Sequence, residues 1–159
     1  MIWPDRRRAN LRDVLFSLTP PTAAEFATLY AETGWGEWPA ETFERALAGS
    51  WVVCVARDDD GRLVGIGRLI SDGALHAFVT EMIVSERARG GGIGAEIVRR
   101  LVEEAHRLGV SDVQLFAARG RTAFYERNGF VRRPEDAPGM QFADAPHGSG
   151  AGGPGGPNP

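Results

Sequence analysis

The chain has 159 residues, 43% hydrophobic and 25% charged, which is the composition of an ordinary globular protein with one core. A formal net charge of −3 argues against a general nucleic-acid binder, which usually carries an excess of basic residues. The single cysteine, Cys54, excludes a disulfide within the chain, no Cys/His cluster has zinc-site spacing, and no apolar run approaches the roughly 20 residues that span a bilayer. We therefore expect a cytoplasmic protein with no metal site, no membrane contact and no nucleic-acid partner.

Composition divides the chain into one central domain and two ends. Residues 1–10 are predicted to form a flexible arm, and residues 11–142 a single domain. Residues 143–159 are rich in Gly and Pro and have little to bury, so we expect a disordered tail.

The spacing of hydrophobic residues in the central domain changes several times between strand and helix periods. The resulting order is β-α-α-β-β-β-α-β-α-β, which predicts an α/β fold with a mixed parallel and antiparallel sheet flanked by about four helices. The predicted elements are a strand within 13–18, helices within 21–34 and 39–49, strands at 50–57 and 62–71 joined by the turn 58–61, a strand within 74–84, a helix at 94–108, a strand within 110–118, a helix within 121–129 and a last extended segment at 130–142.

A run of glycines separates the strand that ends near Val84 from the helix that begins near Gly94. Such a turn leaves several N–H groups pointing outward at the positive end of a helix, and the missing side chains let an anion approach the backbone. Arg87 and Arg89 should add mobile positive charge at its rim. This arrangement predicts a site for a phosphate or pyrophosphate group.

Three interpretations of the glycines compete with one another. A P-loop requires Gly-Lys-Ser/Thr, and the chain contains no lysine. The segment GGGIGA also matches the Rossmann fingerprint, but that site needs an acidic residue at the end of the next strand, whereas Asp112 stands at its beginning. A glycine-rich connection without a ligand stays open as the third interpretation.

Two segments carry a resemblance to a known family. RGGGIG, residues 89–94, resembles the pyrophosphate loop R/Q-x-x-G-x-G/A of the GNAT superfamily of acyl-CoA-dependent N-acetyltransferases. RTAFYERNGFVRR, residues 121–133, resembles the F-Y-x-x-x-G-F element of the same family, and the two lie one helix and one strand apart, as in that family. The resemblance covers roughly residues 50–133 and implies acetyl-CoA as co-substrate. The residues it assigns to acetyl-CoA are Met82, Ile83 and Val84, through their main chain, and Arg89, Gly90, Gly91, Gly92, Ile93, Gly94 and Ala95.

The resemblance also implies catalytic roles. Tyr125 matches the tyrosine that often protonates the leaving thiolate, and a core residue beside Phe124 is the alternative interpretation. The positions at which some members carry a base hold Thr80 and Phe78, which cannot serve. Glu81 is the candidate base, acting through water, but strict strand alternation turns it to the other face unless a β-bulge re-aims it. His76 is a weaker candidate, and deprotonation of the amine by bulk solvent stays open.

The acceptor is expected under the first two helices, where Tyr30 and Trp35, with Trp38 nearby, stand among Glu32, Glu37 and Glu41. Aromatic faces with nearby carboxylates suit a cationic amine of a small molecule or peptide, although simple packing explains the same residues equally well. A non-catalytic acyl-CoA-binding sensor or interaction module is the alternative function. The sequence leaves open the acceptor, the acyl group, and the choice between a monomer and a homodimer.

Overall fold

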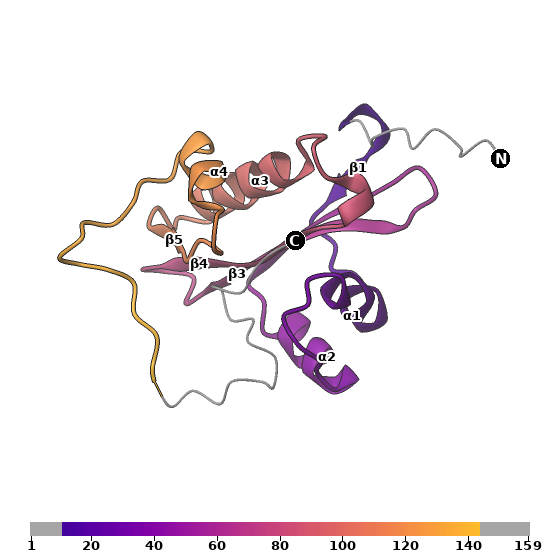
Figure 1. The fold of residues 1–159 in the computed structure, drawn as a ribbon, viewed down its shortest axis with the longest axis horizontal. Helices are drawn as coiled ribbons and strands as arrows, with labels where there is room; N and C mark the ends of the chain where they lie inside the picture. Colours follow the sequence, from indigo (N-terminus) through magenta and orange to yellow (C-terminus); the bar gives the residue numbers. More distant parts are fainter. Residues whose placement is uncertain (1–10, 144–159) are drawn as a thin grey trace.

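Five strands form one sheet in the order β1-β2-β3-β4-β5, and helices cover both of its faces (Figure 1). The computed structural model describes residues 11–143. Strands β1 to β4 are successively antiparallel, whereas β4 and β5 are parallel, so the sheet is mixed as predicted. The elements are η1 (Leu11–Asp13), β1 (Leu15–Ser17), α1 (Ala23–Ala31), α2 (Ala40–Ala48), β2 (Val52–Arg57), β3 (Leu63–Ser71), β4 (Ala77–Val84), η2 (Glu86–Ala88), α3 (Ile93–Arg107), β5 (Val113–Leu115) and α4 (Thr122–Arg127).

Helix α3 covers one face of the sheet with a continuous apolar stripe, which includes Ile97 and Leu101. Two glycines of β3 let it lie close. A Cβ on Gly67 would stand 2.7 Å from Ile97 and 2.8 Å from Leu101, and one on Gly65 would stand 2.8 Å from Ile97. Leu108, which shares the helical spacing, lies just beyond the last turn of α3 and is exposed.

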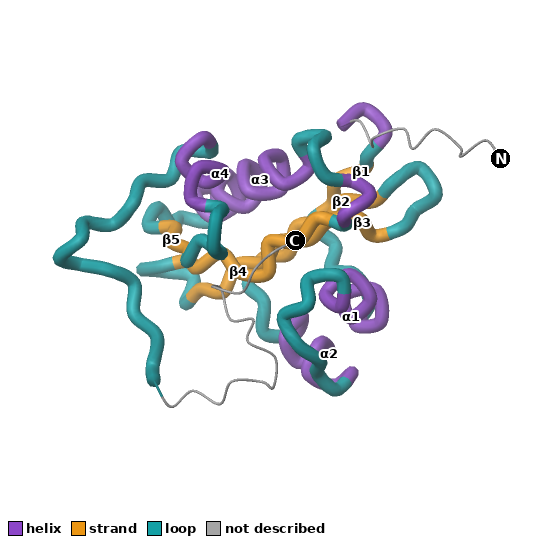
Figure 2. Tube along the Cα trace, in the orientation of Figure 1, coloured by secondary structure: helices purple, strands orange, loops and turns teal. Residues whose placement is uncertain are grey.

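Helices α1 and α2 cover the opposite face, as the tube in Figure 2 shows. Phe26 and Phe43 pack edge to face and lie on the strand residues Val55 and Ile66. The predicted helix start at Thr22 is a capping box, which satisfies two N–H groups of the first turn. The hydrophobic residues of both helices therefore close a second core, separate from the one under α3.

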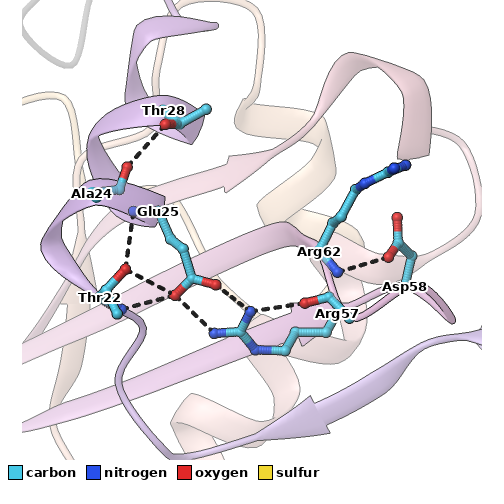
Figure 3. Close-up of polar contacts among 8 residues, drawn as sticks. Thr22, Ala24, Glu25, Thr28, Arg57, Asp58 and Arg62 are labelled. Atoms are coloured by element: carbon cyan, nitrogen blue, oxygen red, sulfur yellow. Dashed lines mark hydrogen bonds and ion pairs between the residues drawn. The ribbon is translucent and has the colours of Figure 1, made fainter.

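The start of α1 is tied to the sheet by an ion pair, drawn in Figure 3. Both Nη atoms of Arg57 donate to the Glu25 carboxylate, at 2.5 and 3.0 Å, and that carboxylate also accepts from the N–H of Thr22 at 2.9 Å. The Arg57 guanidinium lowers the pKa of Glu25 to about 2, with the Thr22 contacts adding to the effect. Glu25 therefore fixes α1 to the end of β2.

Strand β4 contains a β-bulge. On β3, Ile66 pairs with Ile83 and Arg68 pairs with Thr80. The one β3 residue between them, Gly67, therefore faces two residues of β4, Glu81 and Met82. Glu81 has φ of 43°, in the left-handed region that non-glycine residues rarely adopt. Because of this extra residue, Glu81 turns to the face covered by α1 and α2, and not to the face that strict alternation assigns to it.

The prediction of a last extended segment at 130–142 is wrong as far as a strand is concerned, because the structure describes these residues without one. Pro134 and Pro138 have no N–H to donate to a ladder, and the stretch 134–137 forms a turn. Val131 is 89% exposed. Of the strand predicted within residues 110–118, the structure forms only the three residues of β5. The predictions for residues 1–10 and 144–159 lie outside the described residues.

Four α-helices occur in the part of the chain that the structure describes, in agreement with the predicted number. None of the helices among residues 11–143 is both long and apolar enough to cross a membrane.

Candidate functional site

Strand β5 pairs with only the first part of β4. Their ladder joins Ala77–Val79 to Val113–Leu115, after which β5 ends while β4 continues to Val84. The N–H of Ser85 donates to β3, and the trans peptide therefore points the carbonyl of Val84 away from β3, into the opening. An open strand edge of this kind can take up an extended ligand by main-chain hydrogen bonds.

The glycine loop lies directly after this open edge. Strand β4 leads through η2 to residues 89–92, and α3 begins at Ile93. Gly90 and Gly92 have φ of 83° and 84°, and a Cβ on Gly92 would stand 3.1 Å from Leu11. No side chain of the described residues caps the N-terminus of α3. The loop therefore has the strand–glycine–helix geometry that anion binding requires.

The two arginines near the loop are both held in place. The Nε atom of Arg89 donates to the carbonyl of Val84 at 3.1 Å, so this side chain lies across the open edge of β4. Arg87 forms an ion pair of 3.0 Å with Asp58 in the β2–β3 turn. The expectation of mobile charge is therefore wrong for Arg87, because the hairpin brings a carboxylate to it.

Helix α4 packs against the first turn of α3. The ring of Phe124 lies 3.3 Å from where a Cβ on Gly94 would be, so the two motifs noted in the sequence meet in space. Tyr125 packs edge to face on Phe124 and Phe130, with ring centroids 5.0 and 5.9 Å apart. Burial raises the pKa of Tyr125 to about 12, partly offset by Arg121. Its hydroxyl is therefore protonated at neutral pH.

Glu81 is held by Arg68, a residue that the sequence reasoning did not select. Nε and Nη2 of Arg68 donate to the same oxygen, Oε2 of Glu81, at 2.9 and 2.6 Å. Nη1 of Arg68 donates to the carbonyl of Ala46 in α2 and to Oγ of Ser50, just after that helix. One signal was available in the sequence: Arg68 is a lone charge at a position that alternation places inside the apolar strand VGIGRLI.

The predicted acceptor residues Tyr30 and Trp35 lie together on this same side of the sheet. Their ring centroids are 5.8 Å apart, and Nε1 of Trp38 donates to the Tyr30 hydroxyl at 3.2 Å. Burial raises the pKa of Tyr30, the hydrogen bond from Trp38 opposes this increase, and the negative charge of Glu81 adds to it. Tyr30, Trp35, Trp38 and Glu81 form what we call the acceptor cluster.

Glu32 has a different place from the one its sequence neighbours suggest. Its Oε1 accepts from the hydroxyl of Ser85 and its Oε2 from the N–H of Glu86, both at 3.1 Å. The carboxylate thus caps η2 and faces the segment before the glycine loop. It is already engaged by two donors, which argues against a role in attracting a cationic amine.

His76 is not brought to the site. It lies just before β4, at the end of that strand opposite to Val84, and its side chain is 67% exposed. Its Nδ1 is 2.6 Å from Oδ2 of Asp112, which also accepts from Gln114. Asp112 precedes β5 and forms this surface pair with His76. It therefore does not lie at the end of that strand, where the Rossmann interpretation needs an acidic residue.

Comparison with known proteins agrees with this geometry. The family model described as "Acetyltransferase (GNAT) domain" matches residues 49–132. A rice (Oryza sativa subsp. japonica) protein named serotonin N-acetyltransferase 2, chloroplastic, is 32% identical over 117 residues, which are 72% of this chain and 58% of the rice protein. A second rice protein, named probable glucosamine 6-phosphate N-acetyltransferase 2, is 31% identical over 131 residues, 77% of this chain and 69% of that protein.

A solved structure adds to these relatives. The crystal structure of a putative acetyltransferase from Deinococcus radiodurans R1 superposes with a TM-score of 0.70 and 30% identity, covering 85% of this chain and 91% of that one. The chain therefore belongs to the GNAT family, and it is an acetyl-CoA-dependent N-acetyltransferase. The resemblance based on two motifs is confirmed, and so is the predicted fold class.

Proposed function

We propose that this N-acetyltransferase transfers the acetyl group of acetyl-CoA to a primary amine of a small molecule or peptide, by direct attack of the amine on the thioester. The observation that carries the proposal is the open edge of β4 next to the glycine loop. One extended ligand with a pyrophosphate at one end matches both features.

The donor site combines the two features. The main chain of Met82, Ile83 and Val84 pairs with the pantetheine arm as an added strand would, and Arg89 moves from the Val84 carbonyl toward the ligand. The pyrophosphate lies on the backbone of residues 90–95, where the N–H groups at the start of α3 face it. This assignment keeps the residues that the resemblance implies.

In the reaction the amine nitrogen forms a bond to the thioester carbon and the carbon–sulfur bond breaks. The sulfur receives a proton, and the amine loses one. Tyr125 donates the proton to the sulfur as general acid, because its hydroxyl is protonated at neutral pH. The amine loses its own proton through a water at Oε1 of Glu81, since Arg68 uses Oε2.

The acceptor cluster sets the choice of amine. Its aromatic faces and the Glu81 carboxylate attract a cation, and Arg68 offers no competing free charge because it is bound to Glu81 and α2. The names of the two rice relatives include one aromatic and one phosphorylated amine. The cluster favours an amine on an apolar or aromatic body.

Two measurements test the proposal. CoA and NAD are titrated against the purified protein by calorimetry, and a panel of amines is incubated with acetyl-CoA while the free thiol of CoA is followed. We expect CoA to bind at least roughly tenfold more tightly than NAD, and thiol release with at least one amine of the panel. CoA binding without thiol release for any amine would favour the non-catalytic sensor. The cytoplasmic setting stays a prediction.

A further inference from the structure

Glu32 joins two parts of the molecule that lie far apart in sequence. It follows the last residue of α1, and its carboxylate accepts from Ser85 and from Glu86, which stand at the start of η2. Ser85 is only 2% exposed, so its hydroxyl has no free access to water and relies on this carboxylate. Hydrogen bonds to a charged acceptor are roughly twice as strong as neutral ones.

A shift of η2 would move the glycine loop. Its last residue, Ala88, is 1% exposed and packs in the core under α3, and Arg89 follows at once. The N–H of Ser85 is bonded to Val64 of β3, and Arg87 is bonded to Asp58 of the hairpin. The contact with Glu32 joins this segment to the end of α1, on the acceptor side.

The loop that starts with Glu32 also carries two of the acceptor aromatics, Trp35 and Trp38. Thr33 is buried; its hydroxyl donates to the carbonyl of Tyr30 at 2.7 Å and accepts from the N–H of Trp35 at 3.1 Å. This turn folds Trp35 back onto Tyr30, and Trp38 donates to the same phenol. The first residue of this short loop thus contacts the segment before the glycine loop, and the rest of the loop contributes Trp35 and Trp38 to the acceptor cluster.

We infer that Glu32 is a positioning residue that couples the donor site to the acceptor cluster: it holds η2 in the position that CoA requires, and it passes the ordering of the glycine loop on CoA binding to residues 33–38. The inference rests on the proposed function, since it needs CoA at the glycine loop. Coupling between two sites of one protein typically changes affinity by roughly 5- to 150-fold. A single carboxylate should account for the lower part of that range.

The test uses the two tryptophans of the loop as reporters. Of the four tryptophans, Trp3 and Trp51 are replaced by Phe, which leaves Trp35 and Trp38. CoA is then titrated against this protein, followed by Trp emission and, in parallel, by calorimetry. The same titrations are made with Glu32→Gln, and with Glu37→Gln as the matched control, because Glu37 is an exposed carboxylate of the same loop.

We expect CoA to change the emission of the parent with the same midpoint as the calorimetric binding. Glu32→Gln should bind CoA roughly fivefold more weakly and lose most of the emission change, while Glu37→Gln should behave like the parent. Ser85→Ala should weaken binding in part, and adding it to Glu32→Gln should have little further effect, because both remove one contact.

Equal affinity and equal emission change in Glu32→Gln and Glu37→Gln would overturn the inference and leave the proposed function intact. The same conclusion would follow if the parent bound CoA without any change in emission. If calorimetry showed no CoA binding by the folded parent, and CoA left its thermal midpoint unchanged, the proposed function itself would be overturned and the inference with it. The three results are thus separable in one set of titrations.

Discussion

Arg68 and Glu81 form an ion pair across the β-bulge, with Nη2 of Arg68 2.6 Å from Oε2 of Glu81 and the Arg68 side chain only 7% exposed. The guanidinium also donates to the carbonyl of Ala46 in α2 and to the hydroxyl of Ser50 just after it, and lies 5.7 Å from the centroid of the Phe26 ring. A buried cation needs this much compensation for its lost hydration. The pair therefore links the bulge of β4 to β3 and fixes where the Glu81 carboxylate points.

Glu81→Gln should lower kcat/KM by roughly 100-fold or more if Glu81 takes up the amine proton through water. Glutamine keeps one acceptor for Arg68, so CoA affinity should stay the same, while stability falls by about 1–3 kcal/mol because the buried guanidinium loses a charged partner. Steady-state kinetics across pH, with an acceptor found in the panel, make the measurement. A loss below about threefold, with an unchanged profile, would assign deprotonation to bulk solvent.

Tyr125→Phe should lower kcat by roughly 10²- to 10⁴-fold and leave the affinity for acetyl-CoA nearly unchanged, because the ring and its packing are kept. With a pKa of about 12, the parent Tyr125 should not lose its proton below about pH 11, so its own titration should cause no decline of the rate between pH 7 and 10. Single-turnover kinetics separate the chemical step from product release. Tyr30→Phe is the matched control, and it should change the KM of the acceptor more than kcat.

Gly92→Asp should abolish measurable CoA binding, since it puts a carboxylate where a phosphate must lie. Two effects are combined in this variant, because φ at Gly92 is 84° and any Cβ would meet Leu11 at 3.1 Å. Gly92→Ala isolates the backbone effect and should bind CoA more weakly than the parent but more tightly than Gly92→Asp. Calorimetry with each variant, after a check of its thermal midpoint, makes the comparison. Equal CoA binding by Gly92→Asp and Gly92→Ala would place the phosphates elsewhere.

The order of the elements could be predicted from the sequence because each has a local cause. The turn at 58–61, the capping box at Thr22 and the glycine before α3 are all set by residues close in sequence. The glycine loop and the element around Tyr125 could be joined only through the family resemblance. Their contact, Phe124 on Gly94, depends on packing between elements 30 residues apart.

Two features depend on contacts between distant residues: the bulge at Glu81, which the sequence allows but does not require, and the place of Glu32. The bulge that re-aims Glu81 cannot be read from the alternation of β4 alone, because its counterpart is Arg68 on β3. Glu32 looks like one of several surface carboxylates, and its donors stand 53 and 54 residues away. The last extended segment was predicted from its apolar residues, although its prolines remove the N–H groups that a strand needs.

Glu25→Gln should make the protein less stable at neutral pH, and by a smaller amount at pH 3, where part of the charge contribution is already lost. Glutamine keeps the capping-box contact with Thr22 and removes the charge that faces Arg57. Because the folded state lowers the pKa of Glu25 from 4.5 to about 2, its charge stabilises the fold above pH 4.5, and this contribution is lost as pH falls from 4.5 to 2. The pair is partly exposed, so solvent screening should reduce the effect at pH 7 to about 1–2 kcal/mol.

Urea unfolding of parent and variant at pH 7 and pH 3 gives the measurement, with Glu103→Gln, an exposed carboxylate of α3, as control. A stability difference between parent and Glu25→Gln of the same size at both pH values would show that the effect comes from packing and not from the charge.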